Sequence, residues 1–198
     1  MVLIHGLAAH RVVLMPLERR IGRSGFRTLN WGYRSITGEI GRLSGVLATL
    51  LRELDERTDV NRYHLVTHSM GCILARAALG TSAPARLGSV VMLAPPNRGS
   101  TVATRLAPVL GWLCKPLIQL ADGEDSFVNS LPVPQGLRIG VIAAAHDRMI
   151  RIADTVLTTQ ADHIVVPSGH TSMLFRPDVA ALVAGFLRDG RFPRQPAA

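Results

Sequence analysis

The sequence predicts an α/β protein in which a mostly parallel sheet carries helices on both faces. Short apolar runs alternate with longer segments whose apolar residues recur every three or four positions. The short runs are apolar at nearly every position, which is typical of strands buried on both faces of a parallel sheet. The length of 198 residues is that of one domain.

The order of these segments along the chain supports the same fold class. Strands are expected over residues 2–4, 26–31, 63–67, 90–94, 137–145 and 164–166. Helices are expected over residues 12–23, 36–57, 71–79 and 179–187. The helical spacing is clearest in the second of these, where Leu43, Leu47, Leu50 and Leu54 fall on one side. Strands that alternate with helices in this way favour a parallel sheet covered on both faces.

Composition excludes several classes of protein. Hydrophobic residues make up 47% and charged residues 18% of the chain, which rules out a disordered or fibrous protein. Two cysteines are too few for a disulfide scaffold or a four-cysteine zinc site. No phosphate-binding glycine motif and no cluster with metal-ligand spacing is present in the sequence, so neither a cofactor nor a metal is predicted.

The chain is basic, with a formal net charge of +8. Every cation except Lys115 is an arginine, and the arginines are scattered. Because aromatic residues are only 5% of the chain, a nucleic-acid surface is not predicted. Weak association with an anionic membrane surface remains compatible with this charge.

The start of the chain bears on localisation. No leader precedes the first apolar run, and no run approaches the roughly 18 residues that span a bilayer. As written, the sequence predicts a cytoplasmic protein. Because residues 2–4 already have the character of a core strand, the alternative is a start further upstream that includes a leader.

A serine stands where a strand is expected to run directly into a helix, in the segment Leu65-Val66-Thr67-His68-Ser69-Met70-Gly71. This segment resembles the nucleophile elbow of α/β-hydrolases, whose usual form is Gly-x-Ser-x-Gly. Thr67 replaces the first glycine, and Gly71 is retained. The resemblance is closest to small bacterial lipases and esterases, covers residues 2 to about 192, and implies an α/β-hydrolase fold that lacks the first two of its eight strands.

The same resemblance implies an oxyanion hole. The segment Val2–Leu7 is similar to the strand and His-Gly loop that precede the oxyanion donor in these enzymes. The donors would be the backbone amides of Leu7 and Met70. His5 is expected to orient the loop rather than to act in catalysis.

The general base and its acid should follow late strands of the sheet. His170, in Ser168-Gly169-His170-Thr171-Ser172, resembles the histidine loop of these enzymes, and Asp147 follows the expected strand 137–145. The order Ser69, Asp147, His170 is that of the superfamily. Asp162 is the main alternative to Asp147, and Asp154 is a weaker one. Among the other histidines, His68 is expected to point away from the site, and His163 to lie at the opposite end of the sheet.

A segment of nearly forty residues, 97–135, lies where this superfamily often carries a cap, so we expect one domain over residues 1–192 with this insert and a flexible tail over 193–198. Apolar residues recur from Val102 to Leu120 at helical spacing, and Pro108 and Pro116 are expected to divide the segment into short helices, each in a first turn. Val102, Leu106 and Leu113 are the candidate substrate-binding residues. The alternative is ordinary packing of these helices on the sheet.

These motifs predict a serine hydrolase that cleaves carboxylic esters through an acyl-enzyme, with a small acyl ester or a lipid as substrate. A thioesterase or lactonase with the same three residues is one alternative. A hydrolase-like fold that serves as a non-catalytic binding module is another.

Overall fold

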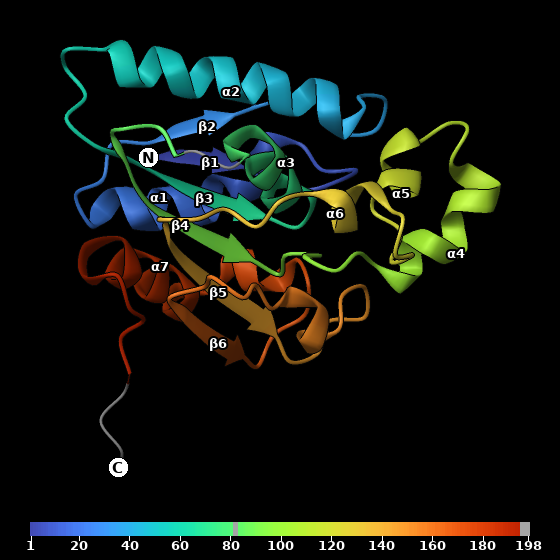
Figure 1. Ribbon diagram of the computed structural model, residues 1–198. Helices are drawn as coiled ribbons and strands as arrows, with labels where there is room; N and C mark the ends of the chain where they lie inside the picture. Colours follow the sequence, from blue (N-terminus) through green and yellow to red (C-terminus); the bar gives the residue numbers. More distant parts are fainter. Residues whose placement is uncertain (81–82, 195–198) are drawn as a thin grey trace.

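The computed structural model describes residues 1–80 and 83–194 (Figure 1). Its centre is a sheet of six strands in the order β2-β1-β3-β4-β5-β6, and every neighbouring pair is parallel. The predicted fold class, with its mostly parallel sheet, is confirmed. The strands are β1 (Val2–Ile4), β2 (Leu29–Trp31), β3 (Tyr63–His68), β4 (Leu87–Leu93), β5 (Arg138–Ala144) and β6 (Asp162–Val166).

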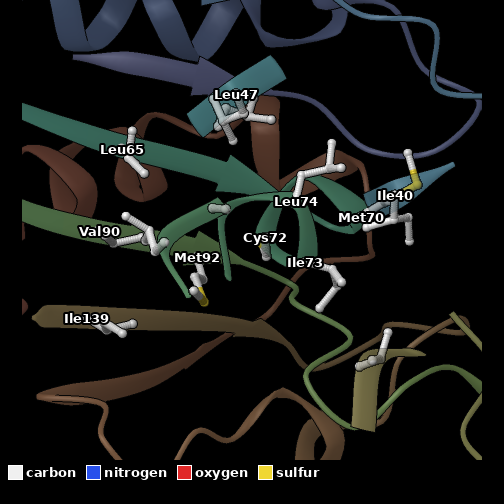
Figure 2. Packing of buried hydrophobic residues seen from close by; sticks show 14 of the residues in the cluster. Ile40, Leu47, Leu65, Met70, Cys72, Ile73, Leu74, Val90, Met92 and Ile139 are labelled. Carbon is white, nitrogen blue, oxygen red and sulfur yellow. The ribbon is translucent and has the colours of Figure 1, made fainter. Parts of the chain in front are cut away.

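Helices cover both faces of the sheet. They are α1 (Met15–Arg23), which follows the 3₁₀ turn η1 (Arg11–Leu14), α2 (Ile40–Glu56), α3 (Met70–Leu79) and α7 (Pro177–Asp189). α2 and α3 pack in one core cluster with alternate residues of the strands, whereas α1 and α7 pack in a second cluster on the other face. Leu65 belongs to the first cluster and Val66 to the second, as the alternation of side chains along a strand requires. Figure 2 shows part of the first cluster, where α2 and α3 meet β3, β4 and β5.

Several elements begin later or earlier than expected; β4, for example, begins at Leu87 instead of residue 90. β2 begins at Leu29 instead of residue 26, and α2 begins at Ile40 instead of residue 36. β6 begins at Asp162, two residues before its apolar run, because Asp162 and His163 pair with Gly140 and Val141 of β5. Pairing of polar residues at the start of a strand leaves no trace in the hydrophobic pattern.

The segment 97–135 forms three short helices, α4 (Thr101–Leu110), α5 (Lys115–Gln119) and α6 (Phe127–Ser130), beyond the carboxyl ends of the strands (Figure 1). Pro116 lies in the first turn of α5, as predicted. Pro108 does not divide the segment but lies inside the last turn of α4, where little helix remains to be disrupted. The break comes instead at Gly111, where an added Cβ would lie 2.5 Å from the carbonyl oxygen of Ala107 and 2.8 Å from Ile118 of α5.

The last residues described lie along β6. The amide of Phe192 and the guanidinium of Arg194 both donate hydrogen bonds to the carboxylate of Asp162. From residue 195 onward, the expected tail lies outside the described residues. Among the residues that are described, no helix has the length and apolar character needed to cross a membrane.

Candidate active site

Ser69 occupies a strained turn between β3 and α3. Its backbone has φ 53° and ψ −125°, a conformation that costs a non-glycine residue roughly 1–3 kcal/mol. Two glycines make room for this turn. A Cβ at Gly71 would lie 2.6 Å from the carbonyl oxygens of Ile4 and His5, and a Cβ at Gly6 would lie 2.8 Å from the Cβ of Ser69. The sharp turn leaves the serine half-buried, with its hydroxyl directed at the carboxyl edge of the sheet.

Thr67 fits the position where the elbow pattern has glycine. Its side chain is fully buried, and its hydroxyl lies 3.3 Å from the carbonyl oxygen of Val91 and 3.1 Å from the sulfur of Cys72. The extra polar atom therefore has a hydrogen-bond acceptor, and the small Cys72 side chain leaves space for it.

The structure brings Ser69, His170 and Asp147 together from the ends of three strands. Ser69 follows β3, Asp147 follows β5, and His170 follows β6. Ser69 Oγ lies 2.9 Å from Nε2 of His170, and Nδ1 of His170 lies 2.7 Å from Oδ2 of Asp147. Both distances are those of hydrogen bonds.

The carboxylate of Asp147 fixes the direction of this chain of hydrogen bonds. Burial alone would raise its pKa, but the hydrogen bonds from His170 and from the amides of Met149 and Ile150 outweigh it, so the pKa of Asp147 is lowered. An ionised carboxylate only accepts, so Nδ1 of His170 carries a proton. Nε2 of the neutral imidazole is then free to accept the proton of the Ser69 hydroxyl.

The two residues whose amides are expected to form an oxyanion hole belong to segments that meet at Ser69. Met70 is the first residue of α3, where a backbone amide has no acceptor within its own helix. Leu7 follows Gly6, whose backbone packs on the Ser69 side chain. His5 is fully buried, its Nδ1 donates to the carbonyl of Gly6 at 2.9 Å, and its ring stacks on Tyr33. These contacts orient the loop that carries Leu7.

The alternative acids lie apart from His170. Asp162 is at the start of β6, the opposite end of the strand, and accepts from Phe192 and Arg194. Asp154 pairs with Arg151 at 2.6 Å. The histidine His163 also lies at the start of β6, where its Nε2 is hydrogen-bonded to Oγ1 of Thr155 at 3.0 Å.

Contrary to expectation, the side chain of His68 does not point away from the site. Its Nε2 lies 3.0 Å from the backbone carbonyl oxygen of His170, and the two rings are 4.9 Å apart. Alternation along a strand places residues 68 and 69 on opposite faces, but the positive φ of Ser69 ends the alternation there. The sequence carried no signal for the contact, because it depends on how the loop after β6 returns to β3.

The apolar residues of the segment 97–135, the expected cap, divide between the core and the surface. Leu117 and Leu120 are buried and join the core cluster beneath α5. Of the candidate substrate-binding residues, Val102 is half-buried, while Leu106 and Leu113 are exposed.

Metal-binding clusters and surface grooves were the other candidate sites. Within residues 1–80 and 83–194, no cluster of His, Cys, Asp and Glu could hold a metal ion. A groove of about 640 Å³ lies between β6 and α7, lined by residues such as His163, Leu182 and Phe192, and Ser69 is not among its lining residues.

Comparison with known proteins supports the fold. A scan of protein-family models and a search of curated proteins both found no match. Solved structures do match. A Bacillus licheniformis lipase in its mature form has a TM-score of 0.71 at 16% identity, with 87% of this chain and 85% of that chain covered.

Two other solved structures are similar. Aspergillus fumigatus lipase B has a TM-score of 0.74 at 12% identity, covering 94% of this chain and 52% of that chain, so this chain spans about half its length. A carboxylesterase of the thaumarchaeon Nitrososphaera gargenis has a TM-score of 0.65 at 17% identity, covering 96% and 89%. The parallel sheet, its strand order and these structural matches together show that the chain has an α/β-hydrolase fold.

Proposed function

We propose that the protein is a serine hydrolase that cleaves carboxylic esters through an acyl-enzyme. The observation that carries this proposal is the directional chain of hydrogen bonds from Ser69 to His170 to Asp147. A nucleophile, a base in hydrogen-bond contact with it and a carboxylate that orients the base are the parts that acyl transfer requires. Neighbours in fold that are named lipases and a carboxylesterase agree with this chemistry.

The first half of the proposed reaction forms the acyl-enzyme. Ser69 Oγ attacks the carbonyl carbon of the ester as its proton passes to Nε2 of His170. The carbonyl oxygen becomes an oxyanion, which the amides of Leu7 and Met70 stabilise. When the ester C–O bond breaks, His170 returns the proton to the departing alkoxide, and the acyl group remains on Ser69.

The second half releases the acid. A water molecule takes the place of the alcohol and gives a proton to His170 as it attacks the acyl carbonyl. The second oxyanion collapses, the bond to Ser69 Oγ breaks, and His170 returns the proton to the serine. Throughout, Asp147 stabilises the imidazolium that forms twice per turnover.

The proposed substrate is an ester with an apolar acyl chain. Trp112, between α4 and α5, is 81% exposed and Leu113 is 56% exposed. Residues 99–121 contain Arg105 and Lys115 but no Asp or Glu, and the whole chain carries +8. Lys115 is paired with Glu39, which lies outside this segment. An apolar surface with cationic residues suits a lipid-like substrate at an anionic interface. Binding to anionic vesicles in a co-sedimentation assay should weaken as salt is added.

A fluorophosphonate probe tests the proposed catalytic centre directly. We expect covalent labelling of the protein at Ser69, turnover of p-nitrophenyl esters, and loss of both in Ser69→Ala without loss of the fold. A folded protein that is not labelled and turns over none of these esters would instead indicate a binding module. Thioesters and lactones in the same assay distinguish a thioesterase or lactonase from an esterase.

A further inference from the structure

His68 joins the strand that carries the nucleophile to the loop that carries the base. It is the last residue of β3, directly before Ser69, and is only 4% exposed. Its Nε2 lies 3.0 Å from the carbonyl oxygen of His170. A carbonyl oxygen only accepts hydrogen bonds, so the proton of the neutral imidazole is on Nε2.

The other ring nitrogen of His68 gives a reason to look beyond packing. Nδ1 is buried and has no hydrogen-bond partner in the described part of the chain. It faces the loop after β1, where a Cβ at Gly6 would lie 3.3 Å from it. An unpaired buried acceptor destabilises a protein by about 1–3 kcal/mol, a penalty that an apolar ring such as phenylalanine would avoid. Packing alone therefore does not explain an imidazole here.

We propose that His68 is a positioning residue that holds the backbone of His170 and so directs its imidazole at Ser69. This inference rests on the proposed function of Ser69 and His170. Asp147 holds the ring of His170 through Nδ1, and His68 holds the backbone carbonyl of the same residue. Two anchors, one on the ring and one on the backbone, restrict the imidazole to orientations in which Nε2 faces Ser69 Oγ. A misplacement of about 1 Å in such a site costs up to about 10²-fold in rate.

The surroundings of His68 keep the donor in place across the neutral pH range. Burial first, and then the neighbouring His170, lower the pKa of His68 to about 3, although its hydrogen bond to the His170 carbonyl and the charge of Asp147 oppose this. His5, on the loop after β1, is the other titratable group that acts on the ring. His68 is therefore neutral when His170 is required as a base, and it places no charge beside it.

Two substitutions separate positioning from packing. His68→Phe keeps an aromatic ring but loses the donor, whereas the side-chain amide of His68→Gln can offer an N–H near the position of Nε2. For hydrolysis of a p-nitrophenyl ester, we expect kcat of His68→Phe to fall about 10- to 100-fold with KM nearly unchanged. We expect His68→Gln to recover most of this loss. The unfolding midpoint of His68→Phe should stay close to that of the wild type, because removal of the unpaired Nδ1 offsets the hydrogen bond lost at the His170 carbonyl.

His64 provides the matched control. It lies on the same strand, near the opposite end, and its Nδ1 accepts a hydrogen bond from the amide of Ser89. His64→Phe should leave kcat and KM at wild-type values, even where it changes stability.

The outcomes distinguish this inference from the function on which it rests. A wild-type protein that is neither labelled by a fluorophosphonate nor active on esters would overturn both. A labelled, active wild type with unchanged kcat in His68→Phe would overturn the role of His68 alone. So would a loss of activity that Gln does not relieve, or one that follows a lowered unfolding midpoint, since each would indicate a structural role.

Discussion

The backbone of Gly6 packs directly on the side chain of Ser69, so that a methyl group at residue 6 would lie 2.8 Å from the serine Cβ. The loop after β1 and the turn after β3 are therefore in contact beside the nucleophile, and each of them carries one of the proposed oxyanion donors. Any side chain at residue 6 must move one of these two segments.

Gly6→Ala should lower activity without unfolding the protein. The added methyl group displaces the Leu7 amide or Ser69, and loss of one oxyanion donor typically costs about 10²- to 10³-fold in kcat. The measurements are ester hydrolysis and the rate of fluorophosphonate labelling, with circular dichroism to monitor the fold. Gly22→Ala is the control, because a Cβ at Gly22 would meet no atom within 4 Å. Wild-type kinetics in Gly6→Ala would contradict the proposed role of the loop.

Asp147→Asn should reduce kcat by a factor on the order of 10⁴, as the equivalent substitution does in serine proteases. The amide no longer holds the tautomer in which Nε2 of His170 accepts the serine proton. Asp162→Asn, at the far end of β6, should leave kcat unchanged. If Asp162→Asn were the damaging substitution and Asp147→Asn harmless, the assignment of the acid would be wrong.

Local patterns predicted the parallel sheet and the approximate positions of its strands along the chain, because strands buried on both faces have an apolar residue at almost every position. They also indicated Ser69, Asp147 and His170 as candidates, since each of these follows a strand in a recognisable turn. The start of β6 at Asp162 and the position of Pro108 inside α4 were not predicted, because they depend on pairing and packing with distant residues. The contact between His68 and His170 was missed for the same reason.

The stability of the protein should fall as the pH drops below about 6.5. Burial, the chain's amino terminus and nearby arginines lower the pKa of His64 to about 4, and burial together with His170 lowers that of His68 to about 3. Between these values and the ordinary value of 6.5, the unfolded chain binds more protons than the folded one, so acid favours unfolding. Urea unfolding at a series of pH values should show this decline, and His64→Gln should make it shallower. A free energy of unfolding that stays constant or rises over this range would contradict the prediction.

Arg76 is a buried cation that ties α3 to the segment 97–135. Its Nη1 donates to the carbonyl of Asn97 at 2.9 Å, and its Nη2 donates to the carbonyl of Leu131 at 3.2 Å. Arg76→Ala should lower the free energy of unfolding by about 2–3 kcal/mol, because it leaves a cavity and removes the donors from these carbonyls. Urea unfolding measures the change, with the exposed Arg105→Ala as control. A loss below about 0.5 kcal/mol would show that these contacts are replaced by water.

The dependence of kcat/KM on the length of the acyl chain tests whether the cap takes part in substrate binding. Each methylene buried in an apolar pocket contributes about 0.8 kcal/mol, so two or three extra carbons should raise kcat/KM by about ten- to a hundredfold. The measurement is a series of p-nitrophenyl esters from short to long acyl chains, on wild type, Leu113→Asp and the control Val46→Asp. Val46 is an exposed apolar residue on α2, 54% exposed against 56% for Leu113. If the cap contacts the acyl chain, a carboxylate at residue 113 should abolish the preference for longer chains, whereas one at residue 46 should not. A preference for short chains that neither substitution changes would exclude Leu113 from the acyl site and indicate an esterase for small substrates.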